Sequence, residues 1–288
     1  MTPYDESGPV ALRMILGAQL RRLRQARGLS REEAGHEIRS SESKISRMEL
    51  GRVGSKTRDV RDLLSFYGVT AEDDREPLMR LARQAREPGW WQEYGDVMPA
   101  WFEEYVGLES AASLIRTYEV QFVPGLLQTD EYARAVATAG GDESSEDVDR
   151  HVRLRMTRGG LLGRAAAPRL WAVVDEAALR RPIGGVEVMR RQVAALIDAV
   201  ARPNIRLQVM PLHFGAHSAE GGAFTILRFP GEDIPDVVYI EQLVGATYLS
   251  KPDDVTPYRR AMDRLAAESP PPDQTGEILR KIHRDLDE

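Results

Sequence analysis

Three polar side chains near the N-terminal end of the chain, Ser43, Lys44 and Arg47, have the chemistry needed to recognise phosphates and bases. If this stretch is helical, Ile45 and Met48 form a narrow apolar seam and the three polar residues point away from it. An arginine on such a face can donate two hydrogen bonds to a guanine edge. The pattern therefore predicts a short helix suited to the major groove of DNA.

The residues around this face predict how it is held. Ser30 is followed three residues later by Glu33, which is the spacing of a capping box, so a helix is expected to begin there. Gly35 gives that helix a small residue where a second helix can cross it. Ser41 is the expected N-cap of the second helix, and Gly51 is the residue expected to end it.

Two more helices are expected beside this pair. Leu16, Leu20 and Leu23 recur at helical spacing and predict a helix over 12–27. A second helix is predicted over 59–67. Together these segments indicate a small all-α domain.

The pattern is similar to the helix-turn-helix family of the lambda-repressor/Cro type, also called the xenobiotic-response-element type. The shared positions are the Leu-Ser opening, the Ile-Ser-Arg centre of the second helix and the Glu-x-Gly end, namely Leu29, Ser30, Ile45, Ser46, Arg47, Glu49 and Gly51. The turn departs from the family, because Arg39-Ser40 replaces a glycine followed by an apolar residue. A residue other than glycine at positive φ costs about 1 kcal/mol, so a looser or reshaped turn is expected.

The resemblance implies a structural ion pair between Arg24 and Glu49. It also implies a DNA-binding surface, for which we expect the following residues: Arg31, Ser41, Glu42, Ser43, Lys44, Arg47, Arg52 and Lys56. An ordinary amphipathic helix pair with solvated charges is the alternative interpretation of the same stretch.

The charge distribution agrees with a nucleic-acid partner for one part of the chain only. The 288 residues carry a net charge of −6. Between residues 10 and 66, thirteen Arg and Lys stand against seven Asp and Glu, a net charge of +6, so the rest carries −12. The chain has no cysteine, no segment typical of a signal peptide and no apolar run of membrane-spanning length. We expect no membrane association and a cytoplasmic protein that is nucleoid-associated when bound to DNA.

The order of the expected elements indicates an α+β protein. We expect a helix-turn-helix domain over 10–86, an aromatic linker over 87–102, a mixed α/β regulatory and dimerisation domain over 103–269, and a Pro-rich tail with a C-terminal helix over 270–288. Strands are predicted at 169–174, 205–210, 223–229, 237–241 and 246–249. Helices are predicted at 106–118, 131–137, 145–162, 185–201 and 255–267.

The second half resembles the domain that follows a helix-turn-helix in many actinobacterial, WhiJ-like regulators. The stretches that carry the resemblance are GWW…YVGLESAA, TYEVQFVPGLLQTDEYARAV, VVDEAALRRPIGG and VMPLHFGAHSAEGGAFTILRFP. The resemblance implies a transcriptional regulator, in some cases antitoxin-like, with a small protein partner encoded nearby.

An enzyme in the second half is the alternative from another class. His213 and His217 lie in the loop HFGAH, with Asp175, Glu176 and Glu220 as candidate companions. Gly215 separates the two histidines, and no nucleophile elbow or phosphate-cradling loop accompanies them. We therefore expect no catalytic site, no metal site and no cofactor, and we consider a site for a small-molecule or peptide effector more plausible.

These observations together predict a sequence-specific DNA-binding transcriptional regulator. We expect a homodimer on a palindromic operator of double-stranded DNA, because a single recognition helix contacts few base pairs. The apolar surfaces expected to hold the dimer are the aromatic group Trp90, Trp91 and Trp101 and the C-terminal stripe Ile278, Ile282 and Leu286. An antitoxin-like protein with autoregulatory DNA binding remains the main alternative.

Overall fold

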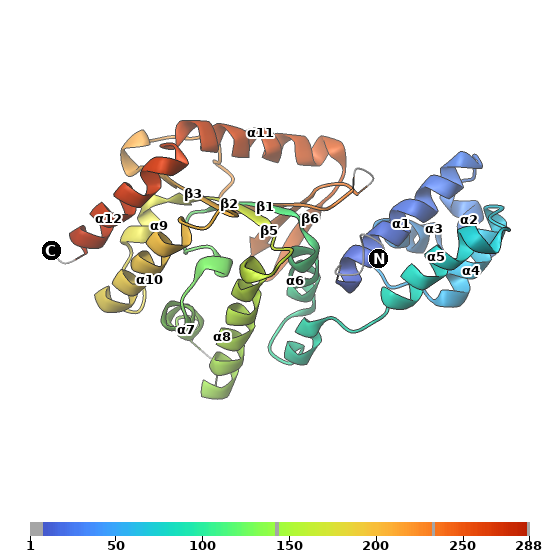
Figure 1. Ribbon diagram of the computed structural model, residues 1–288, viewed down its shortest axis with the longest axis horizontal. Helices are drawn as coiled ribbons and strands as arrows, with labels where there is room; N and C mark the ends of the chain where they lie inside the picture. The colour runs from blue at the N-terminus through green and yellow to red at the C-terminus, as the bar shows by residue number, and fades with distance from the viewer. Residues whose placement is uncertain (1–7, 142–143, 232–233, 287–288) are drawn as a thin grey trace. The chain divides into compact units, whose positions relative to one another are not determined.

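The computed structural model describes residues 8–141, 144–231 and 234–286, and these form two compact units (Figure 1). The first unit is built mainly from residues up to Gln92, and the second mainly from residues beyond it.

The first unit is helical. Its helices are α1 (Pro9–Ala26), α2 (Arg31–Glu37), α3 (Glu42–Glu49), α4 (Thr57–Phe66) and α5 (Glu72–Gln84). Their apolar faces meet in one core, which contains Leu16, Leu20, Ala34, Ile45, Met48, Val60, Leu63, Leu64, Tyr67, Met79 and Ala82. The predicted seam of Ile45 and Met48 is therefore the buried face of α3, with 1% and 2% of each residue exposed. The short 3-10 helix η1 (Trp90–Tyr94) follows α5.

The second unit is organised around a mixed sheet with the strand order β3-β2-β1-β4-β5-β6. Strands β1 (Leu114–Glu119), β2 (Arg169–Asp175) and β3 (Ile205–Met210) are parallel. Strands β4 (Phe224–Arg228), β5 (Val237–Gln242) and β6 (Gly245–Leu249) continue the sheet in antiparallel pairing. Because β1 pairs with both β2 and β4, it is the strand at which the pairing changes direction.

Helices cover both faces of this sheet (Figure 1). Helix α11 (Pro252–Glu268) packs Met262 and Leu265 against the face that carries Tyr118 and Ile226. The other face is covered by helices that include α7 (Asp130–Thr138), α8 (Ser145–Gly159) and α10 (Val186–Ala199). Helix α6 (Ala100–Ala111) precedes β1, α9 (Glu176–Arg180) follows β2, and α12 (Thr275–Asp285) packs on α10 and β3.

The predicted fold class is confirmed, since a helical N-terminal region precedes a mixed helix and sheet domain. The helix expected over 106–118 is wrong: α6 ends at Ala111, and the central strand β1 begins at Leu114. The residues of β1 pair with β2 and β4 on both sides, and Ile115, Thr117 and Tyr118 are residue types that favour a strand. The helix expected over 145–162 has Ser144 as its N-cap and ends at Gly159, where a 3-10 turn continues the chain.

The C-terminal stripe is not a free apolar face. Ile282 is buried, but Ile278 and Leu286 are only half-buried. The residue next to Ile278, Leu279, is the one that is buried in that turn of the helix. Trp91 of the aromatic group is also buried. Each of the two surfaces expected to hold a dimer thus has one residue buried within the chain, Trp91 or Ile282, while its other residues are half-buried.

Candidate nucleic-acid interface

Helix α3 is held close to α1 by a glycine. A Cβ atom at Gly17 would collide with the carbonyl oxygens of Met48 and Glu49, so a larger residue would push α3 away. At the C-terminal end of α3, Gly51 adopts φ of +69°, a left-handed conformation that ends the helix at little cost. The position of α3 is therefore set by backbone contacts at its C-terminal half.

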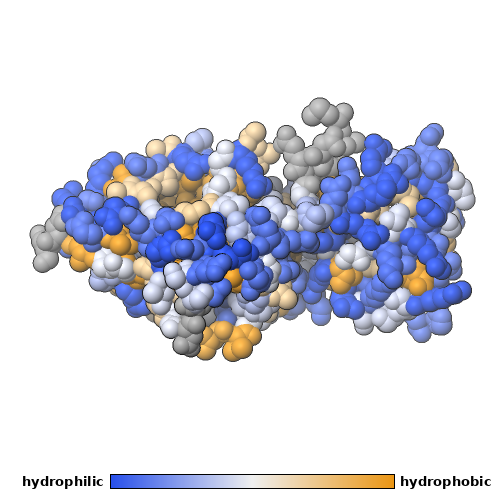
Figure 2. Space-filling model, turned by 90° about the horizontal axis from the view of Figure 1, so that it is seen from below, coloured by the Kyte–Doolittle hydropathy of each residue, from blue (hydrophilic) through white to orange (hydrophobic). Residues whose placement is uncertain are grey.

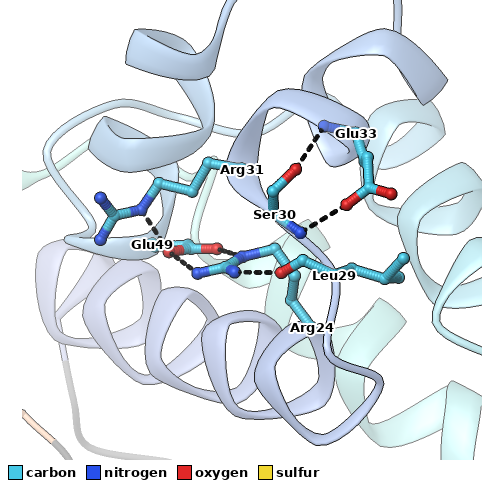
Figure 3. Close-up of polar contacts among 6 residues, drawn as sticks. All are labelled: Arg24, Leu29, Ser30, Arg31, Glu33 and Glu49. Atoms are coloured by element: carbon cyan, nitrogen blue, oxygen red, sulfur yellow. Dashed lines mark hydrogen bonds and ion pairs between the residues drawn. The ribbon is translucent and has the colours of Figure 1, made fainter.

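The N-terminal ends of α2 and α3 are capped as the sequence predicts. Ser30 and Glu33 form a capping box in which the Glu33 N–H donates to Ser30 Oγ at 3.1 Å and the Ser30 N–H donates to Glu33 Oε2 at 2.7 Å (Figure 3). These bonds lower the pKa of Glu33 below its ordinary value. Ser41 accepts from the Lys44 N–H at 3.2 Å and caps α3.

The turn between the two helices is closed despite its unusual sequence. Arg39 has φ of 52° and is the residue other than glycine with positive φ among the residues that the structure describes. The Ser40 N–H donates to the Gly35 carbonyl at 2.8 Å, and the Arg39 N–H donates to the His36 carbonyl at 3.1 Å. The turn is thus hydrogen-bonded rather than loose, and Arg39 takes the strained conformation.

An ion-pair network joins α1, α2 and α3 below the exposed surface (Figure 3). Arg24 Nε donates to Glu49 Oε1 at 2.5 Å and Nη2 donates to Oε2 at 3.1 Å, while Nη1 donates to the Leu29 carbonyl at 2.6 Å. Arg31 Nε adds a contact to Glu49 Oε2 at 3.2 Å. The hydrogen bonds to Glu49 raise the pKa of Arg24, although burial opposes them. The structure therefore brings together the pair that the resemblance implies.

Lys44 is also engaged within the fold. Its Nζ lies 2.7 Å from Oδ2 of Asp59, a residue in the first turn of α4. Of the residues expected at DNA, Arg31 and Lys44 are thus placed in intramolecular ion pairs. The sequence around Lys44 does not indicate that Asp59 is its partner, because Asp59 belongs to a different helix.

The remaining residues expected at DNA are exposed, namely Ser41, Glu42, Ser43, Arg47, Arg52 and Lys56. Ser43 and Arg47 lie on the same side of α3, where Arg47 Nε is 3.4 Å from the Ser43 carbonyl oxygen. On the face drawn in Figure 2, most of the surface of the first unit is hydrophilic, with isolated apolar residues. Such a surface can form hydrogen bonds and ion pairs with a polar partner.

Of the two candidate histidines of the second unit, His217 is held by hydrogen bonds, whereas His213 is exposed. His217 Nε2 lies 2.8 Å from the hydroxyl of the buried Tyr118, and its Nδ1 accepts from the Ala219 N–H at 3.3 Å. Asp175 caps α9 by accepting from the Ala177 N–H at 2.8 Å. Over the described parts of the chain, no group of three or more His, Asp or Glu side chains is arranged to hold a metal ion.

This geometry defines the class of the N-terminal unit: it is a helix-turn-helix domain, with α2 and α3 as the motif. A family model described as a helix-turn-helix domain matches residues 15–78. Residues 102–281 match the model described as a domain of unknown function, DUF5753, and the chain therefore belongs to that family. No curated protein and no solved structure gives a significant match. In the described ranges, no helix has the length and apolar character needed to cross a membrane.

Proposed function

We propose that this protein is a sequence-specific DNA-binding transcription regulator in which α3 enters the major groove. The observation that carries the proposal is the outer face of α3, where Ser43 and Arg47 are exposed on a helix fixed by the Arg24–Glu49 pair. A rigid helix with a small hydroxyl group and an arginine at neighbouring positions can present both to base edges.

The charge distribution supports the same proposal. Residues 10–66 carry a net charge of +6 and the remainder carries −12. A basic module attracts the phosphate backbone, whereas an acidic body is repelled by it. The field of the chain therefore favours an approach to DNA through the first unit.

The second unit serves in this proposal as a dimerisation and regulatory module rather than as an enzyme. A single recognition helix contacts few base pairs, and two copies about 34 Å apart would read a palindromic operator. A small-molecule or peptide effector and a small protein partner, as in antitoxin-like regulators, are the inputs that such a module would receive. The structural roles of His217 and Asp175 support a module without catalysis.

The proposal is tested by selecting operators from random duplexes with the full-length chain and then titrating variants against the selected site. Arg47→Ala should weaken operator binding by about 1–3 kcal/mol if Arg47 reads a guanine edge. Its folding should not change, because the side chain is exposed. Arg22→Ala removes a positive charge from α1 that is also exposed, and it serves as the control. Failure to enrich any sequence, or equal losses in both variants, would remove α3 as the reader.

A further inference from the structure

Lys44 lies on the recognition helix, yet its ammonium group is directed to another helix. Nζ is 2.7 Å from Oδ2 of Asp59, the third residue of α4. The Asp59 side chain is 12% exposed and the Lys44 side chain is 29% exposed. The carboxylate is therefore held in the fold, and the longer lysine side chain reaches it from the surface.

The two partners differ in how much they depend on each other. Asp59 lies in the first turn of α4, where the unpaired N–H groups and the helix dipole favour a negative charge. Lys44 lies in the first turn of α3, where the same dipole disfavours a positive charge. Without Asp59, Lys44 would be an unpaired cation at the N-terminal end of α3, which the helix dipole disfavours. Its ammonium group would then be available to another anion at the surface.

We propose that Asp59 acts as an internal substitute for a DNA phosphate, which neutralises Lys44 and withholds one positive charge from the DNA backbone. The pair also ties the N-terminal end of α3 to α4. Base reading then falls to Ser43 and Arg47, and binding to non-specific DNA is weakened by the loss of one phosphate contact. This inference rests on the proposed function, because it concerns how a DNA-binding surface discriminates.

The test compares four forms of the full-length chain: wild type, Asp59→Asn, Lys44→Met and the double variant. Each is titrated with its selected operator and with a scrambled duplex over a series of salt concentrations. One phosphate contact changes the slope of log K against log salt by about 0.9, which corresponds to about fivefold in affinity at 0.15 M salt. Glu37→Gln is the control, since it makes the same change of net charge at an exposed carboxylate of α2.

Asp59→Asn should steepen the slope by about 0.9 and tighten binding to the scrambled duplex about fivefold, with a smaller preference for the operator. Lys44→Met should keep the wild-type slope, and the double variant should lose the gain of Asp59→Asn. A slope lowered by about one in Lys44→Met would overturn the inference even if Asp59→Asn does not fold, because Lys44 would already contact a phosphate. Equal effects of Asp59→Asn and Glu37→Gln would also overturn it. Wild-type protein that binds neither duplex would instead refute the proposed function, and with it this inference.

Discussion

Arg24 and Glu49 face each other between α1 and α3, and their side chains are 8% and 2% exposed. Two hydrogen bonds join them, from Nε to Oε1 and from Nη2 to Oε2. The relationship is unequal, because Glu49 also accepts from Arg31, a half-buried residue of α2. One carboxylate thus compensates two guanidinium groups.

Because Glu49 has two arginine partners, Glu49→Ala and Arg24→Ala should lower the free energy of unfolding by different amounts. Glu49→Ala leaves Arg24 buried without its charge partner and should cost about 3–5 kcal/mol. Arg24→Ala should cost less, because Glu49 keeps its contact with Arg31. The double variant should cost less than the sum of the single variants, since the two residues touch. Thermal unfolding of the full-length chain measures all three, and additive costs would show that the pair is not formed.

Substitution of the turn residue Arg39 by glycine should relieve the strain of its positive φ. Its φ of 52° disfavours any side chain, whereas glycine adopts this conformation freely. Arg39→Gly should therefore be more stable than Arg39→Ala by about 1 kcal/mol, as both variants lose the same side-chain atoms beyond Cβ. Denaturant unfolding of the two variants gives the difference. Equal stabilities would mean that the turn relaxes to negative φ.

The stability of the second unit should depend on pH through Glu119. Burial raises its pKa from 4.5 to about 7, and the neighbouring Glu241 adds to the shift, while a hydrogen bond from Thr117 opposes it. Between pH 4.5 and about 7, Glu119 therefore keeps its proton in the folded state and has lost it in the unfolded state. The stabilisation is complete below pH 4.5 and is lost as the pH rises through about 7. The loss is about 3 kcal/mol on the scale of 1.4 kcal/mol per pKa unit.

Glu119→Gln should remove this dependence, so that the variant gains stability relative to wild type as the pH rises. Urea unfolding at a series of pH values measures the gain. Glu131→Gln is the control, because Glu131 pairs with Arg191 at the surface and is about half exposed. Parallel curves for wild type and Glu119→Gln would contradict the prediction.

The C-terminal helix should contribute directly to the stability of the second unit. Ile282 of α12 is 1% exposed, and Thr275 Oγ1 donates to the Leu207 carbonyl of β3 at 2.5 Å. Ile282→Ala should cost about 2–5 kcal/mol, as is usual for a buried isoleucine. Ile278→Ala, at a half-buried position of the same helix, should cost clearly less. Sedimentation of both variants should be the same as wild type, and a change of oligomeric state in Ile282→Ala would return this helix to the dimer interface.

The features of the first unit that depend on near neighbours could be predicted from the sequence. The capping box of Ser30 and Glu33, the cap at Ser41 and the end of α3 at Gly51 each need only residues a few positions apart. The fold class and the positions of the later strands follow from the same kind of local pattern.

The features that were missed depend on distant residues. The strand β1 pairs with β2 and β4 on its two sides. Its Ile115, Thr117 and Tyr118 favour a strand, but no glycine or proline marks the break between α6 and β1. The Lys44–Asp59 pair joins different helices, and either residue alone resembles a solvated charge. On α12, packing against α10 selected Leu279 rather than Ile278 as the inward residue, a rotation that spacing alone does not fix.

The central place of β1 has a consequence for the order in which the chain folds. Leu114 pairs with Arg169 on one side and with Arg228 on the other, so this strand cannot complete its hydrogen bonds until most of the second unit has been synthesised. The helices α1 to α5 contact one another within the part of the chain that ends at Gln84, and small helical topologies fold quickly. During translation, we expect the helix-turn-helix unit to reach its final structure while the edges of β1 are still unpaired. A ribosome stalled after residue 200 would thus carry the folded helices α1 to α5 together with a β1 edge that still lacks its partner β4 and is prone to aggregation.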